Sequence, residues 1–248
     1  MIDDDIIGIP PILANLPSCV LYLRPFGTPS GGTTFKDWSP AKKTLTAGGS
    51  VANTTSNTRF PPATLNFTTT SDRIYASTAS DWTFLHNNAA GFICGFWCRQ
   101  TSSTNGITLI DTTNGSSSNT GVYCSAYPDG SIHGITTKSS PGIYSYNATS
   151  TTGLFPFDGT WHYICLALTG ASGTMYIYLD GTQIATSGLL VAASSSSPFG
   201  AVTIGNTVTS NTAGIGNVDE AVIFNAALGV IPSPAQLYAA AKTRRLIV

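Results

Sequence analysis

The second half of the chain carries four strand-like runs in close succession, each bounded by a glycine, aspartate or asparagine turn. They occupy residues 158–168, 176–181, 202–206 and 216–228. Short runs rich in β-branched and aromatic residues, separated by such turns, are typical of antiparallel strands. The Asp180-Gly181 pair between two apolar runs predicts a tight hairpin. We therefore expect an all-β protein.

The composition also fits many short strands better than helices. Charged residues make up only 9% of the 248 residues, and Ser, Thr, Asn and Gly supply the polar surface instead. The apolar share of 42% is sufficient for a core. A formal net charge of −1 gives no electrostatic reason to expect nucleic acid or an anionic membrane as a partner. No uninterrupted apolar run is long enough to span a bilayer.

The first half of the chain predicts further strands. They are expected at 18–26, 64–67, 71–76, 91–99, 107–111, 122–127 and 131–135. The run 91–99 is apolar almost throughout, which predicts a central strand packed on both faces. The intervening segments are expected to be a long surface loop or weak hairpin (44–58), a turn or short helical loop (80–85) and a loop (138–157).

One helix is expected near the C-terminus. Ser233 can cap its N-terminus, Pro234 suits the first helical position, and Gln236 completes a Ser-x-x-Gln capping box. The helix should continue through the alanine-rich stretch that ends near Lys242.

The five cysteines are interpreted as reduced, buried small hydrophobic residues. Cys94 and Cys98 share one predicted strand, where four residues span about 13 Å, too far for a disulfide. A zinc site would need more closely paired ligands.

The order and content of the runs from Asp158 onward resemble the laminin-G-like, concanavalin A-like jelly roll. The matching motifs are the Trp161-His162 pair at the start of an inner strand, the Asp180-Gly181 hairpin turn, and the Asp219-Glu220 pair before the last strand. This resemblance implies a two-sheet antiparallel jelly-roll sandwich with one short C-terminal helix, in which the strands at 64–67 and 71–76 form a pair. To this fold the sequence adds an extended N-terminal arm. The fold usually serves as a binding or structural module, so it leaves the function open.

The resemblance covers roughly residues 18–240, and no boundary divides this stretch. We therefore expect an N-terminal arm at 1–17, one jelly-roll domain at 18–240 and a C-terminal tail at 241–248. Consecutive prolines at Pro10 and Pro11 exclude regular structure in the arm.

Glycoside hydrolysis, which some members of this superfamily catalyse, is not expected. It requires two carboxyl groups that face each other about 5 to 9 Å apart. The chain has one glutamate, Glu220, and alternation along a strand directs the neighbouring Asp219 to the opposite face. His162 is interpreted as a hydrogen-bonded residue of the fold rather than a catalytic base. We expect no enzyme.

No cofactor is expected, and calcium is the one metal left open. Calcium takes six to eight oxygen ligands, and no segment has the dense ligand spacing of an EF-hand loop. The candidate ligands are Asp72, Asp111 and Asp219. The favoured interpretation of Asp219 and Glu220 is structural: their carboxylates accept backbone N–H groups and fix the start of the last strand.

The first functional hypothesis is a non-enzymatic virion structural protein. It would be a capsid decoration or cement protein, or a tail component, of a bacteriophage. The N-terminus lacks the features of a secretory signal, on a fold common outside cells, and the surface is uncharged and rich in Ser, Thr and Gly. This predicts synthesis in the host cytoplasm and a location in the virion.

Attachment would then use the two ends of the chain. Both are expected to bury apolar surface against other capsid or tail subunits, within a homo-oligomeric assembly. The predicted partner-binding residues are Ile2, Ile6, Ile7, Ile9, Ile12, Arg244, Arg245 and Ile247.

The alternative hypothesis is a carbohydrate-binding module that recognises a glycan on a host cell surface. Its support is the lectin-like fold together with aromatic residues predicted on loops, whose rings could stack on sugars. The candidate residues are Trp38, Trp82, Tyr127, Tyr144 and Tyr146.

Overall fold

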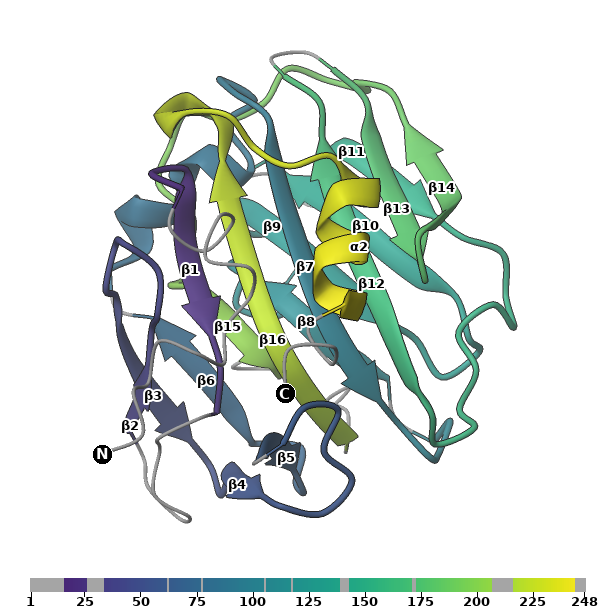
Figure 1. Ribbon diagram of the computed structural model, residues 1–248. Coiled ribbons are helices and arrows are strands. Elements are labelled where there is room, and N and C mark those ends of the chain that lie inside the picture. The colour runs from purple at the N-terminus through teal and green to yellow at the C-terminus, as the bar shows by residue number, and fades with distance from the viewer. Residues whose placement is uncertain are drawn as a thin grey trace.

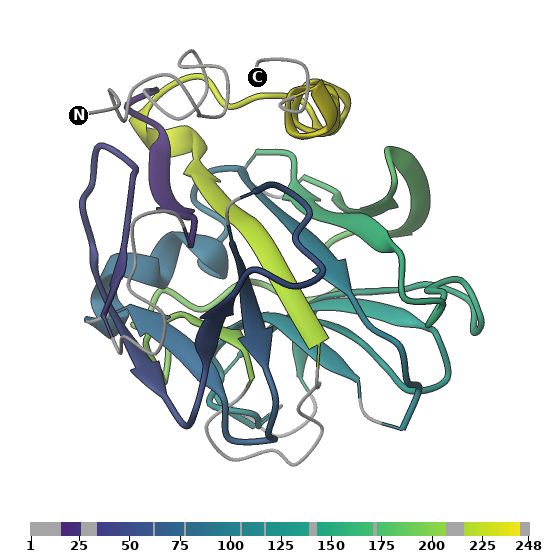
Figure 2. The same cartoon turned by 60° about the horizontal axis from the view of Figure 1, so that its bottom comes forward.

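Two eight-stranded antiparallel sheets pack face to face in the computed structural model (Figures 1 and 2). The structure describes residues 16–25, 34–61, 63–76, 78–104, 106–116, 118–138, 143–170, 173–206 and 216–243. The expected two-sheet antiparallel sandwich with one short C-terminal helix is confirmed.

Sheet A has the order β14-β13-β12-β7-β16-β5-β4, and β1 pairs with the other end of β16 on the same side as β5. Its strands are β1 (Cys19–Leu23), β4 (Ala52–Thr54), β5 (Thr64–Phe67), β7 (Phe92–Arg99), β12 (Trp161–Leu168), β13 (Met175–Leu179), β14 (Thr182–Ser187) and β16 (Gly216–Asn225).

Sheet B has the order β11-β10-β9-β8-β15-β6-β3-β2. Its strands are β2 (Thr34–Lys36), β3 (Thr44–Gly48), β6 (Arg73–Ala76), β8 (Ile107–Asp111), β9 (Gly121–Ala126), β10 (Ile132–Thr137), β11 (Tyr144–Thr149) and β15 (Thr203–Gly205). Two short 3-10 helices, η2 (Ala79–Leu85) and η3 (Ala226–Leu228), and the helix α2 (Pro234–Thr243) complete the described elements.

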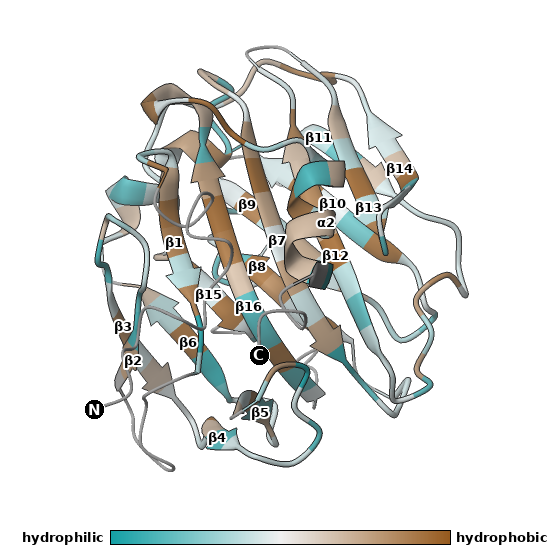
Figure 3. Cartoon of the chain, in the orientation of Figure 1, coloured by the Kyte–Doolittle hydropathy of each residue, from teal (hydrophilic) through white to brown (hydrophobic). Residues whose placement is uncertain are grey.

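Strand β7 is apolar on both faces because each face packs against a different apolar layer. Phe96 and Cys98 point into the core between the sheets, whereas Ile93 and Trp97 point to the outer face of sheet A. Figure 3 shows hydrophobic stretches, coloured brown, along β7 and the neighbouring β16. The prediction of a central strand buried on both faces is confirmed.

Helix α2 lies on this outer face of sheet A, above β7 and β12 (Figures 1 and 2). Its start is the predicted capping box: Gln236 N donates to Ser233 Oγ at 3.2 Å, and Ser233 N donates to Gln236 Oε1 at 2.9 Å. We call the apolar layer that it covers the helix-side cluster. Its members are Cys19, Tyr22, Phe60, Ile93, Trp97, Tyr163, Cys165, Ala167, Val222, Phe224, Leu237 and Ala241. No helix in the described part of the chain is long and apolar enough to cross a membrane.

All five cysteines are free and buried, as predicted. Burial raises the pKa of Cys19 and of Cys124 to about 12. Thiols in this state are protonated and behave as small hydrophobic side chains.

The segment 44–58 is neither a surface loop nor a hairpin. Strand β3 pairs with β2 and β6 in sheet B, whereas β4 pairs with β5 in sheet A. The chain changes sheets at Gly49 and Ser50. Ser50 N donates to Asp72 Oδ1 at 2.6 Å, which ties this crossover to the connection between β5 and β6.

Strands β5 and β6 likewise do not pair with each other, because the turn between them also changes sheets. Asp72 holds this turn: its carboxylate accepts the backbone N–H groups of Thr68 and Thr69. Leu65 and Phe67 of β5 are fully buried in the core. The turn chemistry and these anchors, rather than sequence proximity, decide the pairing.

The segment 138–157 was expected to be a loop and instead contains β11, an edge strand of sheet B. Its register with β10 shifts between Thr136 and Thr137. Ser145 O accepts a hydrogen bond from Leu190 N, and Asn147 N donates to Ser187 Oγ, so the following segment covers this edge.

Candidate functional site

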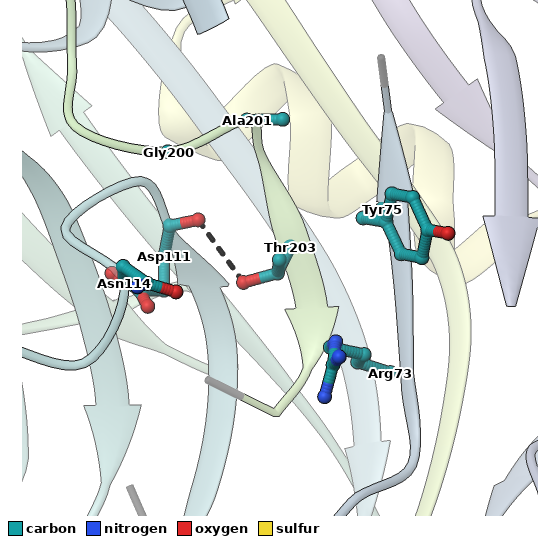
Figure 4. Close-up of a pocket in the computed structure, with 7 residues that line it drawn as sticks. All are labelled: Arg73, Tyr75, Asp111, Asn114, Gly200, Ala201 and Thr203. Carbon is teal, nitrogen blue, oxygen red and sulfur yellow. Dashed lines mark hydrogen bonds between the residues drawn. The ribbon is translucent and has the colours of Figure 1, made fainter. Parts of the chain in front are cut away.

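A pocket of about 140 Å³ opens on the outer face of sheet B, the face opposite the one that α2 covers. It is lined by Arg73, Tyr75, Asp111, Asn114, Gly200, Ala201 and Thr203. In Figure 4, Arg73 and Tyr75 lie on one side, Asp111 and Asn114 lie on the other, and Thr203 stands between them.

Strand alternation places the two β6 side chains at this pocket. Ile74 and Ala76 belong to the core between the sheets, so Arg73 and Tyr75 point outward. Tyr75 pairs in register with Thr203 of β15. Side chains in register on neighbouring antiparallel strands lie about 5 Å apart, which brings these groups to one surface.

The same outward row continues across sheet B. Asp111 pairs with Thr203 on one side and with Tyr123 on the other, and Tyr123 pairs with Ile135 of β10. Beside this row, the ring centroids of Tyr127 and His133 lie 4.2 Å apart. Burial raises the pKa of Tyr127 and lowers the pKa of His133. The outer face of sheet B is therefore polar and aromatic, with His133 held toward its neutral form.

Asp111 ends β8, and its carboxylate organises the turn that follows. Oδ1 accepts Thr113 N and Thr113 Oγ1, both at 2.6 Å, and Oδ2 accepts Gly115 N at 2.9 Å. Asn114 and Gly115 have φ values of 57° and 78°, a left-handed conformation that these residue types adopt readily. Burial raises the pKa of Asp111. The turn thus presents Asn114 at the pocket while it occupies the carboxylate of Asp111.

The loop before β15 closes the third side of the pocket. Gly200 N donates to Thr112 O at 2.9 Å, and Thr203 Oγ1 donates to Asp111 O at 3.1 Å. Gly200 and Ala201 are therefore held against the 111–115 turn by backbone contacts.

Two of the predicted glycan-binding aromatics lie in the interior, which corrects their expected placement on surface loops. Trp82 is 0% exposed within η2. Tyr146 is 1% exposed on β11, and its hydroxyl donates to Asn88 Oδ1 at 3.0 Å. Neither ring can stack on a sugar at the surface.

The other three candidates are partly buried, and the pocket contains none of them. Trp38 packs against the helix-side cluster, and Lys36 Nζ lies 3.4 Å from its ring centroid. Tyr127 follows β9, and Tyr144 lies on strand β11 rather than on a loop. Tyr127 belongs to the outer face of sheet B, beside the row that contains the pocket.

Sequence reasoning missed Arg73 and Tyr75 as site residues. The signal was present in the alternation of Arg73-Ile74-Tyr75-Ala76, where two apolar residues alternate with a cation and an aromatic ring. Their convergence with Asn114 depends on the neighbours of β6 in the sheet, which the local sequence does not specify.

The three calcium candidates lie in separate parts of the sandwich, and the carboxylate of each accepts backbone N–H groups. Asp72 accepts five hydrogen bonds from Ser50, Thr68 and Thr69. Asp111 accepts the N–H groups of Thr113 and Gly115, and Asp219 accepts those of Phe60 and Glu220. Across the described ranges, no three His, Cys, Asp or Glu side chains form a group that could hold a metal ion.

Asp219 and Glu220 do not point to opposite faces of β16, because a bulge interrupts the strand there. The register with β7 shifts between Asp219 and Val222, and Glu220 has a φ of 48°. Asp219 Oδ2 accepts Phe60 N at 3.3 Å, and Glu220 Oε1 accepts the hydroxyl of Tyr22 at 3.0 Å. Both carboxylates therefore contact the helix-side cluster, and both are at most 2% exposed.

The Trp-His and Asp-Gly motifs build the sandwich. His162 Nδ1 lies 2.7 Å from Asp180 Oδ2, and Asp180 Oδ1 accepts Tyr163 N at 2.8 Å. The hydrogen bond to Asp180 raises the pKa of His162. The interpretation of His162 as a hydrogen-bonded fold residue is confirmed. Trp161 Nε1 donates to Asn57 O at 3.0 Å, which ties β12 to a distant loop.

The predicted partner-binding residues of the arm and the tail lie outside the described residues. They are Ile2, Ile6, Ile7, Ile9, Ile12, Arg244, Arg245 and Ile247.

An antiparallel sandwich with one helix-covered face and one open polar face defines the class of this protein: a lectin-like jelly roll. The family model Laminin_G_3, of the concanavalin A-like lectin/glucanases superfamily, matches residues 68–230. The chain belongs to this superfamily. A search of the curated proteins finds no sequence match.

Among solved structures, the chain is similar to the binding domains of botulinum neurotoxins. One is the binding domain of botulinum neurotoxin DC in complex with SialylT, 15% identical, with a TM-score of 0.60 over 92% of this chain and 52% of that chain. The same binding domain in complex with rat synaptotagmin II is 16% identical, with a TM-score of 0.59 over 90% and 51%. A structure of botulinum neurotoxin type C, whose cell entry is described as dependent upon interaction with two ganglioside molecules, is 14% identical, with a TM-score of 0.62 over 92% and 51%.

At these identities the likeness concerns the fold. This chain spans about half the length of the neurotoxin chains that it matches. The partners named for those proteins therefore belong to longer chains, and they are not assigned to the matched half.

Proposed function

We propose that this protein is a non-enzymatic carbohydrate-binding module, which holds the end of a glycan in the pocket on sheet B. The single observation that carries the proposal is the pocket itself, where a guanidinium, an amide and an aromatic ring converge on an exposed sheet face. Membership of a lectin-like superfamily and a fold shared with glycan-associated binding domains support it.

The chemistry of these residue types suits a sugar ring. Arg73 and Asn114 offer N–H donors to hydroxyl groups, and Asn114 also offers an acceptor oxygen. Tyr75 provides an aromatic surface for the C–H face of a pyranose. Pockets for drug-sized ligands are commonly about 300 Å³ or larger. A volume of about 140 Å³ therefore suits one terminal unit rather than a long oligosaccharide.

The arrangement of the acidic residues supports a non-enzymatic role. Glycosidases need two carboxyl groups at a substrate cleft. Asp219 and Glu220 are buried and hydrogen-bonded to Phe60 and Tyr22 of the helix-side cluster, on the side of the molecule away from the pocket. Among the described residues that line the pocket, Asp111 is the one carboxylate, and the turn at 113–115 occupies its oxygens.

A glycan array followed by titration of the hits tests this function. We expect binding to fall at least about tenfold in Tyr75→Ala, which removes the aromatic surface, and in Asn114→Ala, which removes roughly one good polar contact. Asn147→Ala is the matched control, because Asn147 is exposed on β11 at the far edge of the same sheet. No binding to any glycan, with and without calcium, would refute the proposal. An equal loss in Asn147→Ala would place the site elsewhere.

A second candidate is the virion structural role, with attachment of the N-terminal arm to other capsid or tail subunits in a homo-oligomeric assembly. One observation favours it: exposed apolar residues lie where the arm joins the domain. Ser18 Oγ donates to Val230 O at 2.6 Å, and Val230 and Leu228 are 82% and 53% exposed. Leu16 packs against the helix-side cluster.

Deletion of residues 1–15 tests this role. We expect the truncated protein to remain folded and to lose incorporation into virions. Incorporation at full occupancy without the arm would refute attachment through it.

A further inference from the structure

We propose that the pocket on sheet B prefers a glycan end that carries an acidic group, either a carboxylate or a sulfate. This inference rests on the carbohydrate binding proposed above and names its substrate class. It is carried by Arg73, a cation at the pocket wall whose charge no carboxylate of the described chain neutralises.

Arg73 takes no part in the ion pairs of the described residues. Those pairs join Lys43 to Asp81, and His162 to Asp158 and Asp180. Among the described residues, the guanidinium donates one hydrogen bond, from Nη1 to Ser71 O at 3.4 Å. A guanidinium has five N–H donors in a planar fork, so most of its donors remain available to a ligand.

The side chain of Arg73 lies over Gly48 of the neighbouring strand, where the absence of a Cβ leaves space for it. Gly48 of β3 pairs with Arg73 in register. A Cβ at Gly48 would lie 3.1 Å from both Cγ and Nε of Arg73. Glycine therefore leaves the room in which the arginine side chain lies.

The nearby carboxylates do not compete for this cation. Asp111 faces the same pocket, but its two oxygens accept three hydrogen bonds from Thr113 and Gly115. Asp72 is adjacent in sequence, but alternation directs it away from Arg73, and its oxygens accept bonds from residues 50, 68 and 69. Both acids are fixed within turns.

An acidic sugar matches this geometry. A carboxylate or a sulfate can accept two parallel N–H bonds from an arginine fork, and such charge-assisted bonds are about twice as strong as neutral ones. Its ring would then extend toward Thr203 and Asn114, which offer a hydroxyl and an amide. One cation does not suit nucleic acid, whose binding draws on several phosphate contacts.

The experiment is an NMR titration of the full chain with galactose, galacturonic acid and galactose 6-sulfate at low salt. We expect each acidic sugar to bind at least about tenfold more tightly than galactose, as a charge-assisted pair predicts. The Nε–Hε resonance of Arg73 should shift with the acidic sugars. The two acids separate a carboxylate preference from a sulfate preference. Added salt should reduce the preference.

Three variants test whether the preference for acidic sugars depends on the guanidinium of Arg73. Arg73→Gln should remove the preference, so that the acidic sugars bind no more tightly than galactose. Arg73→Lys keeps the charge but loses the fork, and should retain only part of the preference. Gly48→Ala should weaken it through displacement of the guanidinium, with the charge intact. Thermal unfolding of each variant shows that the fold is kept.

The outcomes separate this inference from the proposed function. Equal binding of galactose and both acids, or a preference that survives in Arg73→Gln, overturns the inference and leaves carbohydrate binding standing. Binding of no sugar by the wild-type protein overturns both. A preference that disappears in Arg73→Gln, with the Nε–Hε shift in the wild-type protein, supports it.

Discussion

Asp72→Asn should destabilise the sandwich, because this carboxylate ties together two places where the chain changes sheets. Oδ1 accepts Ser50 N at 2.6 Å and Thr69 Oγ1 at 2.7 Å, and Oδ2 accepts Thr68 N at 2.6 Å and Thr69 N at 2.9 Å. Asparagine has the same shape but only one acceptor oxygen. If that oxygen accepts the N–H groups of Thr68 and Thr69, the NH₂ group of the asparagine faces the N–H of Ser50, and two donors then oppose each other.

The expected cost follows from this geometry. The threonine hydroxyl can rotate and accept from the new amide, but the backbone N–H of Ser50 cannot. The variant loses the hydrogen bond from Ser50 N, and its remaining hydrogen bonds no longer have a charged acceptor. We expect the free energy of unfolding to fall by about 2 kcal/mol, within the range for hydrogen bonds to charged groups. For a domain of this size, such a loss lowers Tm by about 4–8 °C.

Thermal unfolding by circular dichroism measures this change, with Thr70→Ala as the control in the same turn. Thr70 is exposed, so its replacement should leave Tm within about 1 °C of the wild-type value. A Tm for Asp72→Asn that matches this control would refute the role assigned to the carboxylate. Because donors occupy its lone pairs, we also expect no rise in wild-type Tm when millimolar calcium is added.

The stabilisation by Asp72 should depend on pH. Burial opposes ionisation, but the hydrogen bonds from Thr69, Ser50 and Thr68 outweigh it and hold the pKa of Asp72 below 3.8. A depressed folded-state pKa gives stability that is present above the unfolded value and is lost as pH falls through the folded pKa. The difference in Tm between wild type and Asp72→Asn should therefore shrink below pH 4. A difference that stays constant down to pH 2 would contradict this account.

Three further predictions concern the helix-side face of sheet A and its hairpin. Gly95→Ala would place a methyl group against the hydroxyl of buried Tyr163, so we expect a loss of about 1–3 kcal/mol in urea unfolding; unchanged stability would show that the ring can move aside. Ser233→Ala removes a helix cap worth about 1 kcal/mol, and faster hydrogen exchange confined to residues 234–243 should report it. The hydrogen bond to Asp180 raises the pKa of His162, so the stabilisation from this pair is complete below pH 6.5 and fades as pH rises through the folded-state pKa. A difference in Tm between wild type and His162→Asn that stays constant from pH 5 to pH 9 would refute this.

The sequence correctly predicted those elements whose burial, capping or turn depends on residues close to them in the chain. The apolar run at 91–99 has side chains for two different apolar layers, and β7 is indeed buried on both faces. The Ser233-x-x-Gln236 pattern contains both partners of its own capping box. Likewise, the Asp180-Gly181 turn lies between strands that pair across it.

The errors arose where pairing depends on distant residues. Strands β3 and β4 have only a few residues each, and their sheets are decided by β6 and β5 and by the bond from Ser50 to Asp72. Strand β11 contains polar residues and two tyrosines, and it becomes a strand because β10 is available beside it. The bulge at Glu220 broke the alternation from which its direction was inferred.

The position of the pocket follows from the way that the two outer faces differ. On sheet A the outward residues of β7 and β12 are apolar, so this face requires a cover, and α2 provides it with Leu237 and Ala241. On sheet B the outward positions hold Arg73, Tyr75 and their polar neighbours, which can remain in water without a cover. A binding site that needs access to solvent can form on sheet B for this reason, whereas the acidic pair at 219–220 is buried against the helix-side cluster. The same alternation that folds the sandwich therefore separates the face that stabilises it from the face that is free to bind.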